Sequence, residues 1–348
     1  MVEVDPDRAY RIKRYLSLVV HGPDHVELRR GVWNATSTVL RDDSGTGGLS
    51  RVITRLDGSA TSREIATTEE IALDEVLMVV TSLVERDLVD SAAGGFLDHY
   101  LDMVQGRRAM LTAPTPVLVV GSAAIADPLV EIVRASLPTA SIRRVEENHP
   151  LAQVTHRDAD HLKDGLAFHR YAARFADLVG HFVVHLEGVV DPVRTQVINR
   201  VLRHHQVPWL HGAVDGPFVF VGPLVVPGRT PCWECYETRI LLNLREGASY
   251  QGYKRAIAEG RTRAADRSVQ PMLASLLAAH AAPEVLSWSA VGNAATLGQV
   301  FSLFTPTTEF SVHEILALPD CRACAPVPER DDEELYFDSG VLEEVEQR

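Results

Sequence analysis

Cys232-Trp233-Glu234-Cys235 and Cys321-Arg322-Ala323-Cys324 are the two stretches that decide how the second half of this chain folds. Together they hold all 4 cysteines of the sequence, as two pairs with the same internal spacing. Two thiolates separated by two residues can bind one Zn²⁺ through a tight turn, and a second pair completes a tetrahedral shell with no open position. We therefore predict one structural zinc ion, bound by Cys232, Cys235, Cys321 and Cys324, that joins two segments far apart in the sequence.

The same cysteines could instead form two redox-active disulfides, or be four unrelated thiols. The N-terminus, Met1-Val-Glu-Val-Asp5, is too acidic and polar for a signal peptide, so we expect the protein in the reducing cytoplasm, where disulfides are rare. Neither pair opens a thioredoxin-like helix. Zinc is therefore the favoured interpretation, and a closed site of this kind stabilises structure without activating water.

Bulk properties narrow the class of protein further. At 348 residues the chain is long enough for two domains with separate cores. A formal net charge of −13 argues against a sequence-blind nucleic-acid surface, because phosphate binding is driven by clusters of Lys and Arg. No uninterrupted apolar run approaches the roughly 20 residues that span a bilayer. We expect a cytoplasmic protein with neither nucleic acid nor membrane as a partner.

The first part of the chain, from Tyr10 to about Asp90, is predicted to contain three strands followed by three helices. The strands are Leu16–Val20, Val26–Leu28 and Ala35–Leu40, and the first two flank a turn that contains Gly and Pro. The helical signals are an apolar face of Leu49, Val52, Ile53 and Leu56 that ends at Asp57-Gly58, two capping boxes at Thr61-x-x-Glu64 and Thr67-x-x-Glu70, and an apolar stripe of Leu73, Val76, Leu77, Val80, Leu83 and Val84.

This order of elements, with Leu56-Asp57-Gly58-Ser59-x-Thr61 near the end of the first helix, resembles the PqqD-like recognition element of ribosomal peptide natural-product pathways. The resemblance places an α+β, winged-helix-like module at residues 1–95. It implies that a leader peptide adds as a strand beside the third strand and packs on the third helix. The peptide contacts implied in this way are Thr36, Thr38, Leu40, Val76, Val79, Val80 and Leu83.

Winged-helix DNA readers share this layout, so a transcriptional regulator is an alternative. Such a reader needs a basic third helix, whereas Glu69, Glu70, Asp74 and Glu75 make its start acidic. An exposed third strand offers unpaired N–H and C=O groups that an extended peptide can complete. These features favour peptide recognition over DNA recognition.

The rest of the chain is divided into a linker at residues 96–115, an α/β domain at 116–330 and an acidic tail at 331–348. Pro114-Thr-Pro116 precedes Val117–Gly121, which has the pattern of a buried strand. Asp127-Pro128 is typical of a helix start, and Ile142–Val145 could be the next strand. A β-α-β unit of this kind predicts a mainly parallel sheet.

A nucleotide-binding version of this unit carries Gly-x-Gly-x-x-Gly after its first strand, because glycines let the backbone approach phosphates. The loop here is Gly121-Ser-Ala-Ala-Ile-Ala126, which has only the first glycine. Side chains then occupy the space that phosphates need. We therefore expect a Rossmann-type fold without ATP binding by this chain.

Later segments, from Asp191-Pro192 through Pro227–Cys235 to Pro319–Cys324, resemble the ThiF-type fold of ubiquitin-activating enzymes. They resemble most closely the "ocin-ThiF-like" partner proteins, which carry a peptide-recognition element in front and serve a YcaO cyclodehydratase. The resemblance implies a non-catalytic protein that binds the leader of a precursor peptide in azoline or azole peptide biosynthesis. Its implied partners are that peptide and the YcaO enzyme.

Active ThiF-like enzymes differ from this chain at two places. They have an Asn-Leu-x-Arg-Gln segment and an Asp-Asn pair, where this sequence has Asn148-His-Pro-Leu151 and Asp191-Pro192. No cysteine is left as a nucleophile once all four bind metal. An ATP-dependent enzyme that adenylates a peptide is thus the alternative function.

Two further features leave alternatives open. His181, His185 and His211 lie near strands without a carboxylate or second histidine at metal spacing, so we expect hydrogen-bonded structural groups rather than bases or ligands. The small residues Ala278–Ala282 permit close helix packing, inside the domain or in a homodimer.

Overall fold

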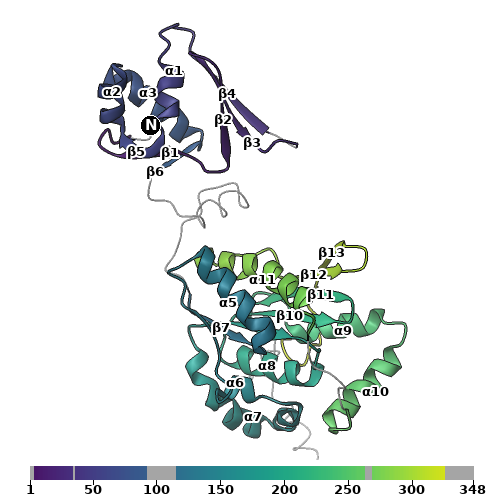
Figure 1. The fold of residues 1–348 in the computed structure, drawn as a ribbon. Coiled ribbons are helices and arrows are strands. Elements are labelled where there is room, and N and C mark those ends of the chain that lie inside the picture. The colour runs from purple at the N-terminus through teal and green to yellow at the C-terminus, as the bar shows by residue number, and fades with distance from the viewer. Residues whose placement is uncertain (1–3, 34–35, 92–114, 263–268, 326–348) are drawn as a thin grey trace, which may run out of the picture. The chain divides into compact units, whose positions relative to one another are not determined.

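The computed structural model describes residues 4–33, 36–91, 115–262 and 269–325. The chain forms two compact units (Figure 1). We treat residues 4–91 as the N-terminal module and residues 115–325 as the sheet domain, because each has its own hydrophobic core. The predicted tail at 331–348, and the predicted linker at 96–115 except for its last residue, lie outside the described residues. Within the described ranges, no helix has the length and apolar character of a membrane span.

A three-stranded antiparallel meander forms one half of the N-terminal module. Its strands are β2 (Leu16–Gly22), β3 (His25–Arg30) and β4 (Thr36–Arg41), with β3 in the centre. Leu28 of β3 lies opposite Leu18 of β2 and Thr38 of β4, and its side chain is 1% exposed. The three predicted strands are confirmed, and β4 is an edge strand of its sheet.

Three helices complete this core, as predicted, and gather beside the meander in Figure 1. They are α1 (Leu49–Thr54), α2 (Ser62–Glu69) and α3 (Leu73–Glu85). The capping box at Thr61 is confirmed, since the Glu64 N–H donates to the Thr61 hydroxyl at 3.2 Å and the Thr61 N–H donates to the Glu64 carboxylate at 2.8 Å. The second predicted box is wrong. Thr67 lies inside α2, where its hydroxyl donates to the Arg63 carbonyl.

A small second sheet in the module was not predicted. It has the order β5-β1-β6, and its strands are β1 (Ala9–Ile12), β5 (Asp57–Thr61) and β6 (Val89–Ser91). The predicted helix stop at Asp57-Gly58 is therefore the beginning of β5, and α1 ends earlier, at Thr54.

The sheet domain is built on a seven-stranded mixed sheet of order β13-β12-β11-β10-β9-β7-β8. Four neighbouring strands are parallel: β8 (Ile142–Arg144), β7 (Val117–Val120), β9 (Phe182–Glu187) and β10 (Trp209–Asp215). The remaining strands extend the sheet antiparallel: β11 (Phe218–Val225), β12 (Gln299–Phe304) and β13 (Glu309–Glu314). The predicted parallel sheet is thus only one half of the observed one. Edge strand β13 leaves Phe310 and Val312 about half exposed between Glu309 and Glu314.

Helices pack on both faces of this sheet. The α-helices are α5 (Ala123–Ser136), α6 (Pro150–Gln153), α7 (Gly165–Ala172), α8 (Pro192–His204), α9 (Trp233–Asn243), α10 (Gly247–Ala258) and α11 (Pro271–Val291), and two 3₁₀ segments are η1 (His156–Lys163) and η2 (Ala173–Leu178). A Cβ at Gly212 of β10 would lie 3.1 Å from the Leu277 side chain, so α11 contacts that face directly. Trp209 of β10 packs with the residues of α8 on the other face.

The Asp191-Pro192 pair begins a helix. Asp191 caps α8, because its carboxylate accepts hydrogen bonds from the N–H groups of Val193 and Arg194. The start predicted at Asp127-Pro128 is wrong, because α5 begins at Ala123 and contains Pro128. The carboxylate of Asp127 instead pairs with Arg144 at 2.8 Å. Pro128 has no N–H to donate to the carbonyl of Ala124, four residues earlier in the helix. Ala124 is an exposed residue.

Candidate functional site

The two Cys-x-x-Cys stretches form tight turns that face each other. Cys232 is the N-cap of α9, so the first pair does stand at the start of a helix, contrary to expectation, and the Cys232 carbonyl accepts the Cys235 N–H at 3.1 Å. Cys321 and Cys324 lie in a second turn, closed by the Ala325 N–H on the Cys321 carbonyl at 2.9 Å. All four are free cysteines, and all except the partly buried Cys324 are buried.

The distances between the sulfur atoms fit a metal ion. Cys232 Sγ lies 3.7 Å from Cys321 Sγ, and Cys235 Sγ lies 3.4 Å from Cys324 Sγ. All four sulfur atoms lie within 4.8 Å of one another. A tetrahedron with Zn–S bonds of about 2.3 Å has S–S edges of about 3.8 Å, whereas a disulfide bond measures about 2.0 Å. The predicted ligand set is therefore brought together, and it can hold a metal ion.

Neighbouring groups fix the orientation of this four-cysteine site. The Leu318 N–H donates to Cys235 Sγ at 3.4 Å. Arg200 of α8 donates to both oxygens of Glu234, at 2.6 and 2.9 Å, and a third N–H donates to the Arg322 carbonyl at 2.6 Å. Arg200 thus connects α8 to both cysteine turns. Hydrogen bonds of this kind, made around a metal site by residues that are not ligands, hold the ligands in position.

A buried polar cluster lies on two neighbouring parallel strands, β9 and β10. Glu187 ends β9 and is 4% exposed, and it accepts hydrogen bonds from Thr195 at 2.9 Å and from His211 at 3.1 Å. His185 is fully buried beside it, 3.4 Å from the Glu187 carboxylate. His185 and His211 are direct neighbours in the β9–β10 register. His185 and His211 are therefore hydrogen-bonded through Nε2, as predicted, but their carboxylate partner was missed. The Nδ1 atom of His181, the third histidine of that prediction, is buried without a hydrogen-bond partner among the described residues.

Protonation states in this cluster follow from burial and contact. Burial lowers the pKa of His185, although the neighbouring Glu187 carboxylate acts in the opposite direction. Burial alone would raise the pKa of Glu187, but the two histidines more than offset it and hold that pKa well below its usual value. Glu187 is thus an ionised carboxylate whose hydrogen bonds are made within the fold.

The loop after β7 has a packing role of its own. A Cβ at Gly121 would lie 3.0 Å from the Leu186 carbonyl oxygen, so this glycine permits the close approach of β7 to β9. Ala123 and Ala126 stand at the second and third positions of the phosphate-binding fingerprint, and Ala126 is fully buried in α5. Strand packing accounts for Gly121 without a bound phosphate.

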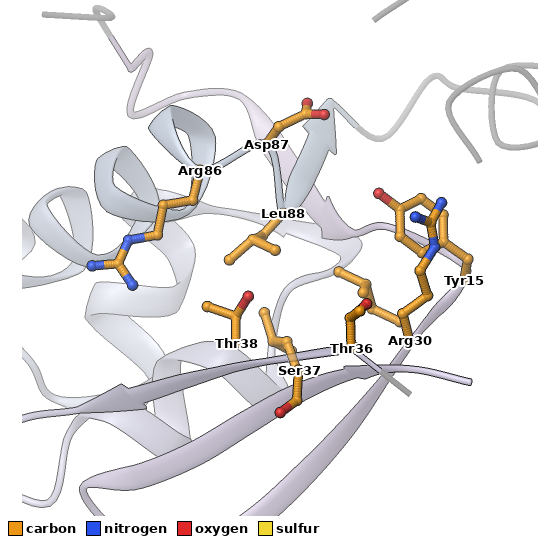
Figure 2. A pocket seen from close by; sticks show the side chains of 10 residues that line it. Tyr15, Arg30, Thr36, Ser37, Thr38, Arg86, Asp87 and Leu88 are labelled. Carbon is orange, nitrogen blue, oxygen red and sulfur yellow. The ribbon is translucent and has the colours of Figure 1, made fainter. Parts of the chain in front are cut away.

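A cleft of about 290 Å³ opens in the N-terminal module, beside edge strand β4. Thr36, Ser37 and Thr38 line it from β4, and Arg86, Asp87 and Leu88 line it from the turn between α3 and β6. Figure 2 shows the α3 end and β4 on opposite sides of this space, with Leu88 and Thr38 facing each other across it. The open edge of a sheet and the end of a helix thus border the same cavity.

The residues predicted to contact a peptide occupy different environments in this module. Thr36 is exposed and Thr38 is half-buried, and both line the cleft. Val79 is half-buried on α3. The others, which are Leu40, Val76, Val80 and Leu83, belong to the module's own core and are at most 9% exposed. A peptide in the cleft would therefore contact the threonines directly, and these four only if the core opened.

Several solved structures have the same fold. The heterocyclase TruD matches with a TM-score of 0.65 and 19% identity, over 91% of this chain and 43% of that one. A heterocyclase in complex with substrate and cofactor matches with a TM-score of 0.66 and 18% identity, over 91% and 40%. MccB of E. coli with ATP matches with a TM-score of 0.51 and 14% identity, over 91% and 99%. No protein-family model and no curated protein matches the chain.

At these identities the likeness establishes the fold. The predicted α/β architecture is thus shared with the two heterocyclases and with MccB. The chain spans less than half the length of either heterocyclase.

Proposed function

We propose that this chain binds the leader of a ribosomally made precursor peptide and presents the peptide to a separate YcaO-type cyclodehydratase. That partner converts Cys, Ser or Thr residues of the peptide to azolines and consumes the ATP. The chain itself carries a structural zinc ion and no catalytic residue. Tethering the leader would raise the effective concentration of the modifiable segment at the partner's active site.

The observation that carries this proposal is the open edge of β4 beside a cleft. The Asp42 N–H, just beyond β4, donates to the Asp24 carbonyl at 3.0 Å. Hydrogen-bonded and non-hydrogen-bonded pairs alternate along an antiparallel ladder, so Thr38, four residues earlier, pairs with β3. Ser37 and Val39 then direct their N–H and C=O groups outward. An extended peptide could bond these groups and lay alternate side chains in the cleft.

Length supports a division of labour between two proteins. A heterocyclase that shares the fold is more than twice as long as the segment this chain matches. A separate enzyme would then supply the activity of the part of that heterocyclase that this chain does not match. The rival function, peptide adenylation by this chain, is motivated by the fold shared with MccB and its ATP complex. Pyrophosphate exchange with purified chain and peptide separates the two, because sustained exchange without a second protein would establish the rival.

Proline at Val39 tests strand addition. It removes one outward donor of β4 and leaves the pairing with β3 intact. The matched control is proline at Val20, which the same alternation places with its N–H outward on β2, the opposite edge of the meander. The full chain is mixed with a YcaO-type enzyme and a Cys/Ser/Thr-rich peptide, both taken from neighbouring open reading frames, and ring formation is followed as loss of water by mass spectrometry.

We expect Val39→Pro to slow ring formation at low peptide concentration and Val20→Pro to leave it unchanged. Thermal unfolding of both variants shows whether the module is still folded. Equal rates for Val39→Pro and the unaltered chain would refute strand addition at β4. Equal rates with and without this chain would refute its role as the presenting protein.

A further inference from the structure

The charged residues that line the cleft beside β4 are two arginines and one aspartate. Arg30 and Arg86 both line it. Asp87 is the acidic group among its lining residues, and its carboxylate lies 2.7 Å from the Lys13 ammonium. The Lys13 side chain is 1% exposed, whereas the Asp87 side chain is 50% exposed. The buried Lys13 ammonium thus neutralises the charge of the Asp87 carboxylate. Besides this pair, the lining contributes two arginines, in a chain with a net charge of −13.

Arg30 is held in position before any ligand arrives. Its guanidinium lies 4.6 Å from the centroid of the Tyr15 ring, and Figure 2 shows the two side chains together at one end of the cleft. Arg30 lies opposite Thr36 in the β3–β4 register. A stacked guanidinium keeps its planar set of donors and loses little side-chain entropy when it binds a carboxylate.

Arg86 occupies the other end, beyond Thr38 (Figure 2). It follows the last residue of α3 and is exposed. A strand added along β4 would turn every second side chain toward the cleft, about 7 Å apart. One such side chain lies near Thr38 and Arg86, and the next lies near Thr36 and Arg30.

We propose that the cleft selects extended peptides with an acidic residue at the cleft-facing position beside Thr38, where Arg86 binds the carboxylate, while Arg30 adds positive charge at the next cleft-facing position. The inference rests on the proposed peptide-binding function and adds the chemical class of its ligand. A nucleic acid could also supply anionic groups, but its backbone lacks the alternating N–H and C=O groups that complete a β-strand edge. The proposal therefore commits to an acidic peptide.

The test uses the full chain and a random 12-residue peptide library in mRNA display, selected in parallel on the unaltered chain and on Arg86→Glu. The unaltered chain should enrich peptides with Asp or Glu at one fixed position. The variant should lose that preference and enrich Lys or Arg there. For a peptide from the first selection, Arg86→Glu should weaken binding about tenfold or more, because hydrogen bonds to charged groups are involved.

Two controls make the result specific. Arg8→Glu reverses an exposed charge of the same module outside the cleft and should leave both motif and affinity unchanged. Replacing the peptide's acid by Lys should restore binding to Arg86→Glu. Arg86→Gln tests the same contact without an added negative charge and should also lose the acidic preference.

The outcomes separate the two levels of the proposal. Enrichment of one and the same motif by the unaltered chain and Arg86→Glu, or of a motif without an acid, would overturn acidic selection and leave peptide binding intact. Failure of both chains to enrich any peptide would overturn peptide binding itself. Displacement of the peptides by a random oligonucleotide at physiological salt would assign the cleft to nucleic acid instead.

Discussion

Removal of the metal ion should destabilise the sheet domain by an amount that follows from the chain length it closes. Cys232 and Cys321 are 89 positions apart. A cross-link over a loop of that length removes unfolded-state entropy worth about 4 to 5 kcal/mol. A metal ion that binds only the folded chain adds its binding free energy to the free energy of unfolding. Loss of the ion should therefore lower the free energy of unfolding by at least the contribution of the cross-link. For a domain of this size the melting temperature should fall by about 10 to 20 °C.

The assay compares thermal unfolding of the purified chain before and after treatment with a zinc chelator, with metal content measured on the same samples. Cys324→Ser should reproduce most of the loss, since it removes one ligand from the least buried position of the site. The chelator should then have little further effect on the variant. An unchanged melting temperature in chain shown to be free of metal would refute the structural role of the site. Detection of one metal ion other than zinc per chain would support the structural role of the site and change only the identity of the ion.

Other consequences can be tested by mutation and pH. Arg200→Ala should cost about 2 to 3 kcal/mol in urea unfolding, because it leaves the 8% exposed Glu234 without its cation, whereas Arg203→Ala on the same helix should cost little. Leu28→Ala should destabilise the N-terminal module by about 2 to 5 kcal/mol, while Val20→Ala, at 49% exposed, should change its melting only slightly. The pKa of His185 and that of Glu187 are both lowered by folding, so the unfolded chain binds more protons as pH falls, and the sheet domain should lose stability below about pH 6.5 and again below about pH 4.5. Glu187→Gln should remove the lower of these two losses, and a pH profile unchanged by it would contradict the assigned charge.

The metal centre could be predicted because its information is local. Each pair of cysteines fixes its own turn, and only the approach of the two turns depends on the fold. The observed contacts run between turns, Cys232 with Cys321 and Cys235 with Cys324. Spacing alone does not reveal that pairing.

The cluster around Glu187 could not be predicted, because distant pairing assembles it. Glu187 and His211 are 24 positions apart and meet only through the parallel register of β9 and β10. The small sheet was missed for the same reason. Asp57, Gly58 and Ser59 of β5 have low strand propensity, and their partner β1 lies far back in the sequence. At Pro128 a local rule gave a wrong helix start, because α5 begins at Ala123 and continues through the proline.

The outer edge of β13 bears on how this protein behaves in concentrated solution. Its exposed Phe310 and Val312 would favour adhesion between copies along that edge. If two copies paired antiparallel there, Glu309 of one would face Glu314 of the other at both ends of the ladder. Like charges opposite each other repel. Colloidal stability should therefore decrease in acid and at high ionic strength, which recommends neutral buffers of low salt for crystallisation and storage.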